Sequence, residues 1–126
     1  MTGNMKVAAS TNRGGLEDKV TEIFGRAGSF TVIEIENGDV KSVEVMENFA
    51  GRGSGAGISA AQLIADKGVE ALLTGRVGPN ALDALKSAGI KIYNAGGMSV
   101  RKALDELLNG KLSEINVASA GRRRGW

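Results

Sequence analysis

Histidine and cysteine are both absent from this sequence of 126 residues, which also has a single proline and only 4% aromatic residues. Without cysteine, the chain forms no disulfide and offers no thiolate to an iron–sulfur cluster. Without histidine, it lacks the commonest metal ligand and the commonest general base. The composition therefore indicates a binding protein and not an enzyme, and we assign no catalytic residue and no metal-ligating side chain.

Long hydrophobic runs are also missing. No apolar stretch approaches the roughly 20 residues that a membrane-spanning helix needs, and the first residues show no signal-peptide pattern. We therefore expect a cytoplasmic protein with no membrane partner. The length suits one domain, and the hydrophobic content of 42% is ordinary for a globular protein.

The net charge of +2 hides an uneven distribution along the chain. Arg122, Arg123 and Arg124 lie together near the C-terminus, and without them the chain has 13 basic against 14 acidic residues. We predict one domain over residues 1–115, followed by a flexible basic tail over residues 116–126. The folded body lacks the broad basic face that nucleic-acid binding requires, which leaves the tail, with Trp126, as the one alternative route to a nucleic acid.

The first half of the chain predicts three strands, at residues 5–10, 30–36 and 40–46. Asn37 and Gly38 accept the positive φ of a tight turn, so the second and third strands form a hairpin. In the third strand, Val43 and Val45 alternate with polar residues, which is typical of a half-buried strand. Between the first two strands, residues 16–25 predict a short helix that places three apolar residues on one face, namely Val20, Ile23 and Phe24.

The second half alternates helices with strands. After a glycine-rich loop at residues 51–57, the sequence predicts three helices. The first ends at Lys67, the second starts at Pro79 and the third covers residues 100–108. The strands between them are predicted at residues 69–73 and 90–93. Pro79 suits a first helical turn because its missing N–H would be unpaired there, and Ser99 is placed to cap the last helix. The order β-β-β-α-β-α-β-α predicts an α/β fold with a five-stranded mixed sheet, in which only the second strand is antiparallel and helices pack on the sheet.

Four arginines, each next to a glycine, fall at one edge of this predicted sheet: Arg13, Arg26, Arg52 and Arg76. Their segments leave the first, third and fourth strands or enter the second, so all reach the carboxyl edge, where open α/β sheets bind ligands. Helix N-termini at that edge also favour an anion. The arrangement predicts an anion-binding cradle, with Glu17 and Asp18 as the only carboxylates in its loops. The alternative is that the glycines serve the turns alone and the arginines are ordinary surface residues.

Two more familiar sites find no support. Residues 51–57 resemble a dinucleotide-binding glycine run, but they follow a hairpin instead of opening a β-α-β unit. The strand order is that of ribonuclease-H-like folds, whose nucleases hold metal ions through carboxylates on the central strands. Here the first strand has no carboxylate and the fourth leads into Thr74, so two-metal nuclease chemistry is not expected.

Four short motifs carry a resemblance that extends in order over residues 6–112. They are Phe24-Gly25-Arg26-Ala27, Gly55-Ala56-Gly57-Ile58, Gly78-Pro79-Asn80-Ala81 and Gly89-Ile90-Lys91-Ile92-Tyr93. Together they resemble the nitrogenase iron–molybdenum-cofactor biosynthesis family, and most closely its orange-protein-like branch. The resemblance implies a ribonuclease-H-like fold and a role in binding or carrying metal–sulfur clusters.

One departure from that family concerns histidine. Many relatives carry His directly before Phe-Gly-Arg-Ala, where this chain has Ile23, and some carry it in the loop that here reads Arg52-Gly53-Ser54. A histidine-ligated cofactor is therefore not implied. Met46 and Met98 offer thioether sulfur, but methionines in such places are more often packing residues.

The leading hypothesis is a carrier for an anionic metal–sulfur cluster, either an iron–molybdenum-cofactor precursor or a molybdenum–copper–sulfur species, held non-covalently by arginines and backbone amides. The expected partners are proteins that donate or accept the cluster, and the chain is expected to be a monomer or a homodimer. The alternative is a regulatory or scaffold module that binds a protein or a small phosphorylated metabolite. The predicted binding residues are Arg13, Arg26, Arg52, Gly53, Ser54, Gly55, Gly57, Thr74, Gly75, Arg76, Gly78 and Asn80.

Overall fold

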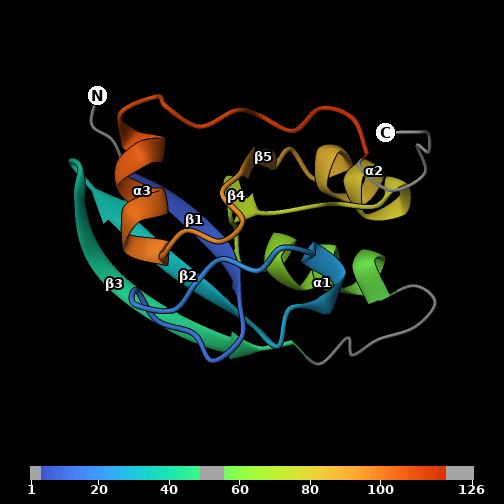
Figure 1. Ribbon diagram of the computed structural model, residues 1–126, viewed down its shortest axis with the longest axis horizontal. Coiled ribbons are helices and arrows are strands. Elements are labelled where there is room, and N and C mark those ends of the chain that lie inside the picture. The colour runs from blue at the N-terminus through green and yellow to red at the C-terminus, as the bar shows by residue number, and fades with distance from the viewer. Residues whose placement is uncertain (1–3, 49–55, 119–126) are drawn as a thin grey trace.

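The computed structural model describes residues 4–48 and 56–118, and within them the chain folds around one five-stranded sheet (Figure 1). Its strands are β1 (Asn4–Thr11), β2 (Ser29–Glu36), β3 (Asp39–Glu47), β4 (Ala71–Thr74) and β5 (Lys91–Asn94), in the order β3-β2-β1-β4-β5. The strand β2 is antiparallel to both of its neighbours, whereas β1, β4 and β5 are parallel. The predicted mixed sheet with a reversed second strand is confirmed.

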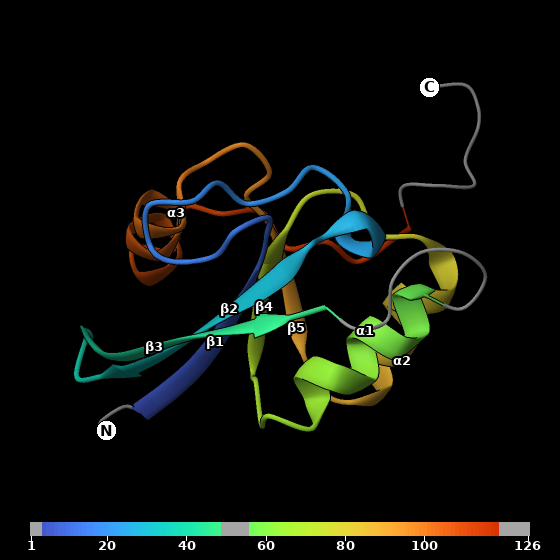
Figure 2. The ribbon, with the colours of Figure 1, turned by 90° about the horizontal axis from the view of Figure 1, so that it is seen from below.

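Helices cover both faces of the sheet. Helices α1 (Ala56–Ala65) and α2 (Pro79–Ser87) pack on one face and α3 (Val100–Leu108) packs on the other (Figure 2). Proline stands in the first turn of α2, and the Ser99 hydroxyl accepts a hydrogen bond from the Lys102 N–H at 3.1 Å, so both predicted helix starts are confirmed. Within the described part of the chain, every helix is too short to cross a membrane.

The core lies in two layers because the central strands are buried on both faces. On the side of α1 and α2, the ring centroids of Phe24 and Phe30 are 5.5 Å apart, and Leu72 and Leu85 pack with them. On the side of α3, a second layer joins the sheet to the helix. It consists mainly of Val7, Ile33, Leu73, Val100 and Leu104.

The β2–β3 hairpin turns as predicted, with Asn37 at φ 55° and Gly38 at φ 87°. The pairing then shifts, because Glu34 lies opposite Ser42 while Ile35 lies opposite Val40, which leaves Lys41 as an extra residue in a β-bulge. The alternation in β3 does not bury its apolar face. All of β3 is exposed except Met46, which packs against the core beside α1 and α2.

The prediction of a short helix over residues 16–25 is wrong. Residues 18–23 instead run extended across the ends of the strands, and only Phe24–Arg26 form a turn of 3₁₀-helix. Their backbone groups bond to distant segments: the Val20 N–H donates to the Met98 carbonyl at 2.8 Å, and the Thr21 N–H donates to the Ser10 carbonyl at 2.8 Å. We call residues 18–24 the crossing segment.

The outer edge of β5 is covered by the chain that follows α3. The Asn94 N–H donates to the Ser113 carbonyl at 2.9 Å, and the Ile115 N–H donates to the Ile92 carbonyl at 2.7 Å. Residues 113–115 therefore lie along β5, while the end of the domain at residue 115 stays a prediction. Most of the predicted basic tail, residues 119–126, lies outside the described residues, so its flexibility stays a prediction.

Candidate functional site

The carboxyl ends of β1, β4 and β5 meet at one edge of the sheet, and the crossing segment ties them together. The Arg76 N–H donates to the Glu22 carbonyl at 2.6 Å, and the Phe24 N–H donates back to the Arg76 carbonyl at 2.9 Å. On the other side, the Gly97 N–H donates to the Val20 carbonyl at 2.9 Å. The crossing segment is thus held between the loop after β4 and the loop after β5.

These bonds place two of the predicted arginines on neighbouring segments of the same edge. Arg76 pairs with Ile23 in an isolated parallel bridge, and Arg26 follows three residues later, at the end of the 3₁₀ turn. Both arginines are exposed, and neither forms an ion pair with a described residue. The edge therefore carries two guanidinium groups that form no ion pair within the part of the chain that the structure describes.

A hollow of about 360 Å³ opens on the crossing segment, and we call it the edge hollow. Its charged residues are Lys19, Glu22 and Arg26, while Ile23 supplies apolar surface and is 37% exposed. Because the hollow is shallow and mixes cations with a single anion, it suits a small charged ligand that stays partly in solvent. It is lined by Asn12, Lys19, Val20, Thr21, Glu22, Ile23, Arg26 and Gly97.

Glu22 brings a carboxylate to an edge where we expected only Glu17 and Asp18. Three glycines make room for Glu22. Gly75 does so most strictly, because a Cβ there would overlap the backbone carbonyl oxygen of Glu22. A Cβ on Gly96 would lie 3.0 Å from Glu22 Oε1, and a Cβ on Gly97 would lie 3.0 Å from Oε2. Gly75 is therefore required for packing of the crossing segment, which is a different role from the ligand access that we predicted.

Asp18 already fills the anion site formed by the loop after β1. Its Oδ2 accepts hydrogen bonds from the N–H groups of Asn12, Arg13 and Gly14 at 2.9, 2.8 and 2.9 Å, and its Oδ1 accepts one from Lys19 at 2.9 Å. Burial works to raise the pKa of Asp18, but these four hydrogen bonds outweigh it and lower the pKa below its usual value. The backbone amides around Arg13 are thus occupied by the chain's own carboxylate.

Thr74 is buried and does not reach the surface. Its hydroxyl lies 2.7 Å from the Ser10 hydroxyl, which also accepts a hydrogen bond from the Thr21 hydroxyl at 2.7 Å. These three side chains connect the buried ends of β1 and β4 to Thr21, which lines the edge hollow. Thr74 accordingly supports the crossing segment from below, whereas we had predicted that it donates to a ligand.

The other predicted residues divide into three sets. Gly78 caps α2 and Asn80 is exposed in its first turn, so both lie at the carboxyl edge. Gly57 lies inside α1, where a Cβ would come within 3.0 Å of the Ala81 Cβ, and this explains it as a helix-packing residue. The four predicted residues of the preceding loop lie outside the described residues: Arg52, Gly53, Ser54 and Gly55.

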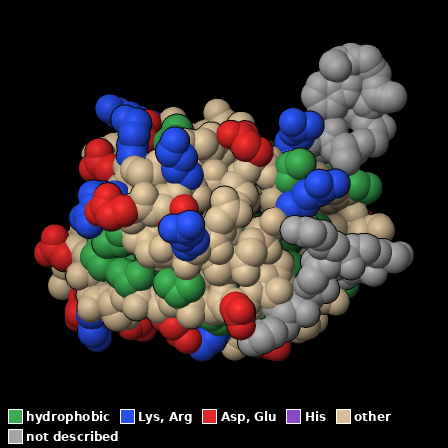
Figure 3. All heavy atoms as spheres, turned by 60° about the horizontal axis from the view of Figure 1, so that its bottom comes forward, with side chains coloured by type: hydrophobic (Ala, Val, Ile, Leu, Met, Phe, Trp, Pro, Cys, Tyr) green, Lys and Arg blue, Asp and Glu red, His purple; other side chains and the backbone are tan. Residues whose placement is uncertain are grey.

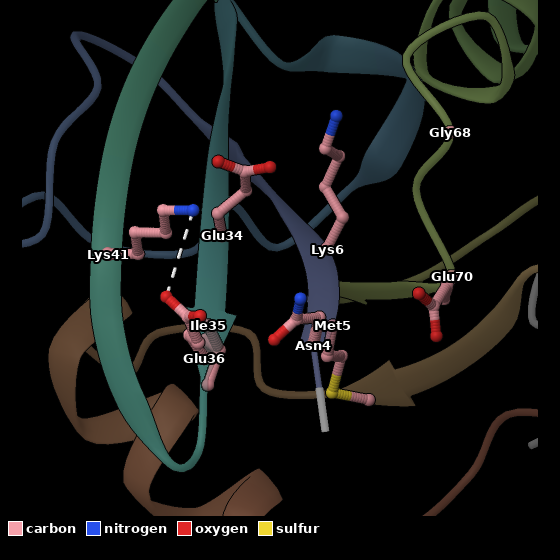
Figure 4. Close-up of a pocket in the computed structure, with 9 residues that line it drawn as sticks. All are labelled: Asn4, Met5, Lys6, Glu34, Ile35, Glu36, Lys41, Gly68 and Glu70. Atoms are coloured by element: carbon pink, nitrogen blue, oxygen red, sulfur yellow. Dashed lines mark ion pairs between the residues drawn. The ribbon is translucent and has the colours of Figure 1, made fainter. Parts of the chain in front are cut away.

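A second hollow, of about 190 Å³, lies at the opposite edge, beside the start of β1 (Figure 4). Its cations are already engaged: Lys41 pairs with Glu36 at 3.7 Å, and Lys6 Nζ donates to the Lys67 carbonyl at 3.0 Å. Glu34 and Glu70 also line it. Because acidic side chains outnumber basic ones here, this hollow does not favour an anion.

Sequence reasoning predicted Arg26 but missed Lys19 and Glu22, because it placed them in a helix. The β-branched residues Thr21 and Ile23 were a signal against that helix. The chain has no histidine or cysteine, and the described residues contain no group of three acidic side chains arranged to hold a metal ion. The donor set of this edge therefore fits an anion held by charge better than a metal ion held by direct ligation.

Known proteins share this sequence pattern and this fold. A family model described as dinitrogenase iron–molybdenum cofactor matches residues 5–110. An uncharacterised protein of Methanocaldococcus jannaschii is 38% identical over 99 residues, which cover 78% of this chain and 84% of that protein.

Two solved structures are similar over nearly their whole length. The apo form of the orange protein of Desulfovibrio gigas is 36% identical with a TM-score of 0.83, covering 91% of this chain and 96% of that one. A Thermotoga protein described as a candidate NifB protein is 34% identical with a TM-score of 0.79, covering 94% of this chain and 99% of that one. Together with the match over residues 5–110, these similarities show that the chain belongs to the dinitrogenase iron–molybdenum cofactor family.

Proposed function

We propose that this chain is a binding protein for an anionic metal–sulfur cluster related to the iron–molybdenum cofactor, and that it carries this cargo without transforming it. The observation that supports the proposal best is the pairing of the Arg76 loop with the crossing segment. It collects Arg26, Arg76 and Lys19 at the carboxyl edge without an ion-pair partner among the described residues.

The side chains, more than the backbone, would hold the cargo. The amides of residues 12–14 bind Asp18, and those of Gly28, Arg76 and Gly97 bind backbone carbonyls. The backbone N–H groups in the first turn of α2 are the ones that remain available to the cargo. The first N–H groups of a helix lack intrahelical acceptors, and Asn80 is exposed there. Guanidinium groups suit a thiometallate because they are always charged and present several N–H donors in one plane.

The test is an anaerobic titration with tetrathiomolybdate, with and without copper(I), followed by visible absorption. The parent protein should acquire the colour of the bound anion, and Arg26→Ala combined with Arg76→Ala should weaken binding by about tenfold or more, given two lost charge-assisted contacts. Lys91→Ala combined with Lys111→Ala is the matched control, since it removes the same charge away from this edge. Equal weakening in both double variants would contradict a localised site.

A regulatory module that binds a phosphorylated metabolite makes the opposite prediction. It would give a colourless protein whose thermal midpoint rises with phosphate compounds and not with thiomolybdate. The parent protein distinguishes the two functions, because only one of the two ligands would shift it. The arginine pair would contribute to the binding of either ligand, so the double variants locate the site in both cases. The cluster carrier also requires partner proteins that load and unload it.

A further inference from the structure

The two edges of the sheet are finished differently. The outer edge of β5 is covered by residues 113–115, which bond to Asn94 and Ile92. The outer edge of β3 is nine residues long, and no described strand pairs with it. A long open edge exposes a row of unpaired N–H and C=O groups, which natural proteins normally shorten or cover.

One face of β3 is also apolar. Val40, Val43 and Val45 lie opposite Ile35, Ile33 and Thr31 of β2, so they point to the face of the sheet that α3 covers. Helix α3 packs over the core of β1 and β4 and leaves these valines 45%, 40% and 47% exposed. Apolar side chains gather on the left of Figure 3, the side of the molecule where Figures 1 and 2 place β3.

We propose that β3 pairs with β3 of a second copy of this chain. The two strands run antiparallel about a two-fold axis perpendicular to the sheet, which joins two five-stranded sheets into one. This pairing satisfies the open backbone edge and covers the exposed valines in the same step, as an isologous contact does. The inference is independent of the proposed cargo.

The β-bulge restricts the register. Regular pairing in β3 begins at Ser42, after the extra residue Lys41, and ends at Glu47. A two-fold axis through Glu44 places Val43 opposite Val45 of the second copy, and Val45 opposite its Val43, so four valines form one apolar cluster. An axis through Val45 would instead place Val43 opposite Glu47 on the same face, which makes the first register the better one.

The charged side chains are compatible with the register centred on Glu44. This side chain lies on the face opposite to the valines, and its carboxylate already pairs with Lys67 Nζ at 2.9 Å. Two copies of Glu44 therefore approach the axis together with two counter-cations. The described chain ends beside α2, away from the hairpin end of β3 (Figures 1 and 2).

The dimer should be weak. A ladder of about five residues with a small apolar cluster falls short of the roughly 1,200 Å² that a standard stable interface buries. We expect a dissociation constant on the order of micromolar to millimolar, with monomer at low concentration and dimer at high concentration.

Sedimentation equilibrium over a wide concentration range tests the pairing. The parent should show a monomer–dimer equilibrium, and Val43→Lys should weaken it at least tenfold, because it places two cations in the valine cluster. Val117→Lys makes the same change at a valine that is 69% exposed and far along the chain from β3, and it should leave the equilibrium intact. A parent that stays monomeric throughout, or a dimer that survives Val43→Lys, overturns the proposal.

Cross-linking locates the axis, and it works cleanly because the chain has no native cysteine. Under mild oxidation, Glu44→Cys should form a disulfide-linked dimer at least tenfold faster than Asp83→Cys, an exposed position on α2. Equal rates for the two variants contradict a two-fold axis at Glu44.

Discussion

Asp18 Oδ2 accepts a hydrogen bond from the backbone N–H of Gly14 at 2.9 Å. Because two further amides share the same oxygen, this carboxylate fixes the loop after β1 and keeps that loop's anion site filled. The anion-binding cradle that we predicted from the arginines is therefore not one continuous site. Asp18 occupies the part after β1, and the part that is open to a ligand lies at the crossing segment.

Asp18→Asn should lower the free energy of unfolding by about 1–2 kcal/mol at neutral pH, because a neutral amide accepts these hydrogen bonds more weakly. The lowered pKa means that the folded state binds its proton less readily than the unfolded state. The contribution of Asp18 is therefore fully present above the usual value of 3.8 and is lost as the pH falls through the lowered folded pKa. Urea unfolding of parent and variant at neutral pH and near pH 2–3 measures this. Asp83→Asn is the control, and a difference that grows in acid would contradict the assignment.

Gly75→Ala should destabilise the fold by about 1–3 kcal/mol, as overpacking of a core does, because the new Cβ meets the Glu22 carbonyl. The matched control is Gly25→Ala, since a Cβ on Gly25 has no neighbour within 4 Å. Thermal unfolding compares the two. If Gly75→Ala unfolds at the same temperature as the parent, the crossing segment shifts to make room for the new Cβ, and the close approach has no cost in stability.

Glu22→Gln should tighten the binding of tetrathiomolybdate by up to about fivefold, because it removes a negative charge from a partly exposed hollow where one ion pair is worth up to about 1 kcal/mol. Glu70→Gln makes the same change at the opposite edge and should have no effect. The expected gain shrinks at high salt. Weaker binding by Glu22→Gln would show instead that the carboxylate contacts the cargo directly.

Ile23→His should convert charge-based capture into direct ligation. Ile23 lines the edge hollow and is 37% exposed, and imidazole is a common metal ligand. We expect about tenfold tighter retention of the metal during gel filtration, together with a shifted visible spectrum. Ile58→His, at an exposed position of α1, is the control. An unchanged spectrum would mean that position 23 does not face the bound metal.

Much of the fold was readable from local sequence signals. Asn37-Gly38 identified the hairpin, and Ser99 and Pro79 identified two helix starts, because each acts on its own neighbours. The direction of the strands followed from their order. The position of Arg26 and Arg76 at one edge could then be predicted without knowing any contact.

The remainder depended on contacts that sequence spacing does not show. The crossing segment is extended because Val20 bonds to Met98 and Glu22 bonds to Arg76, and these partners are far away in the sequence. Placing residues 16–25 in a helix hid Glu22 and misplaced Ile23. The exposure of Val43 and Val45 likewise depends on where α3 packs, which the alternation in β3 alone does not determine.

The connections of the crossing segment also set an order of assembly. Its backbone partners include Ser10, Arg76 and Met98, so its extended path exists only after β1, the loop behind β4 and the loop behind β5 have all come together. Such non-local contacts form late, since the chain must close long loops before they are made. The edge hollow should thus be the last part of the molecule to appear during folding, and no fragment that ends before Met98 should bind the ligand.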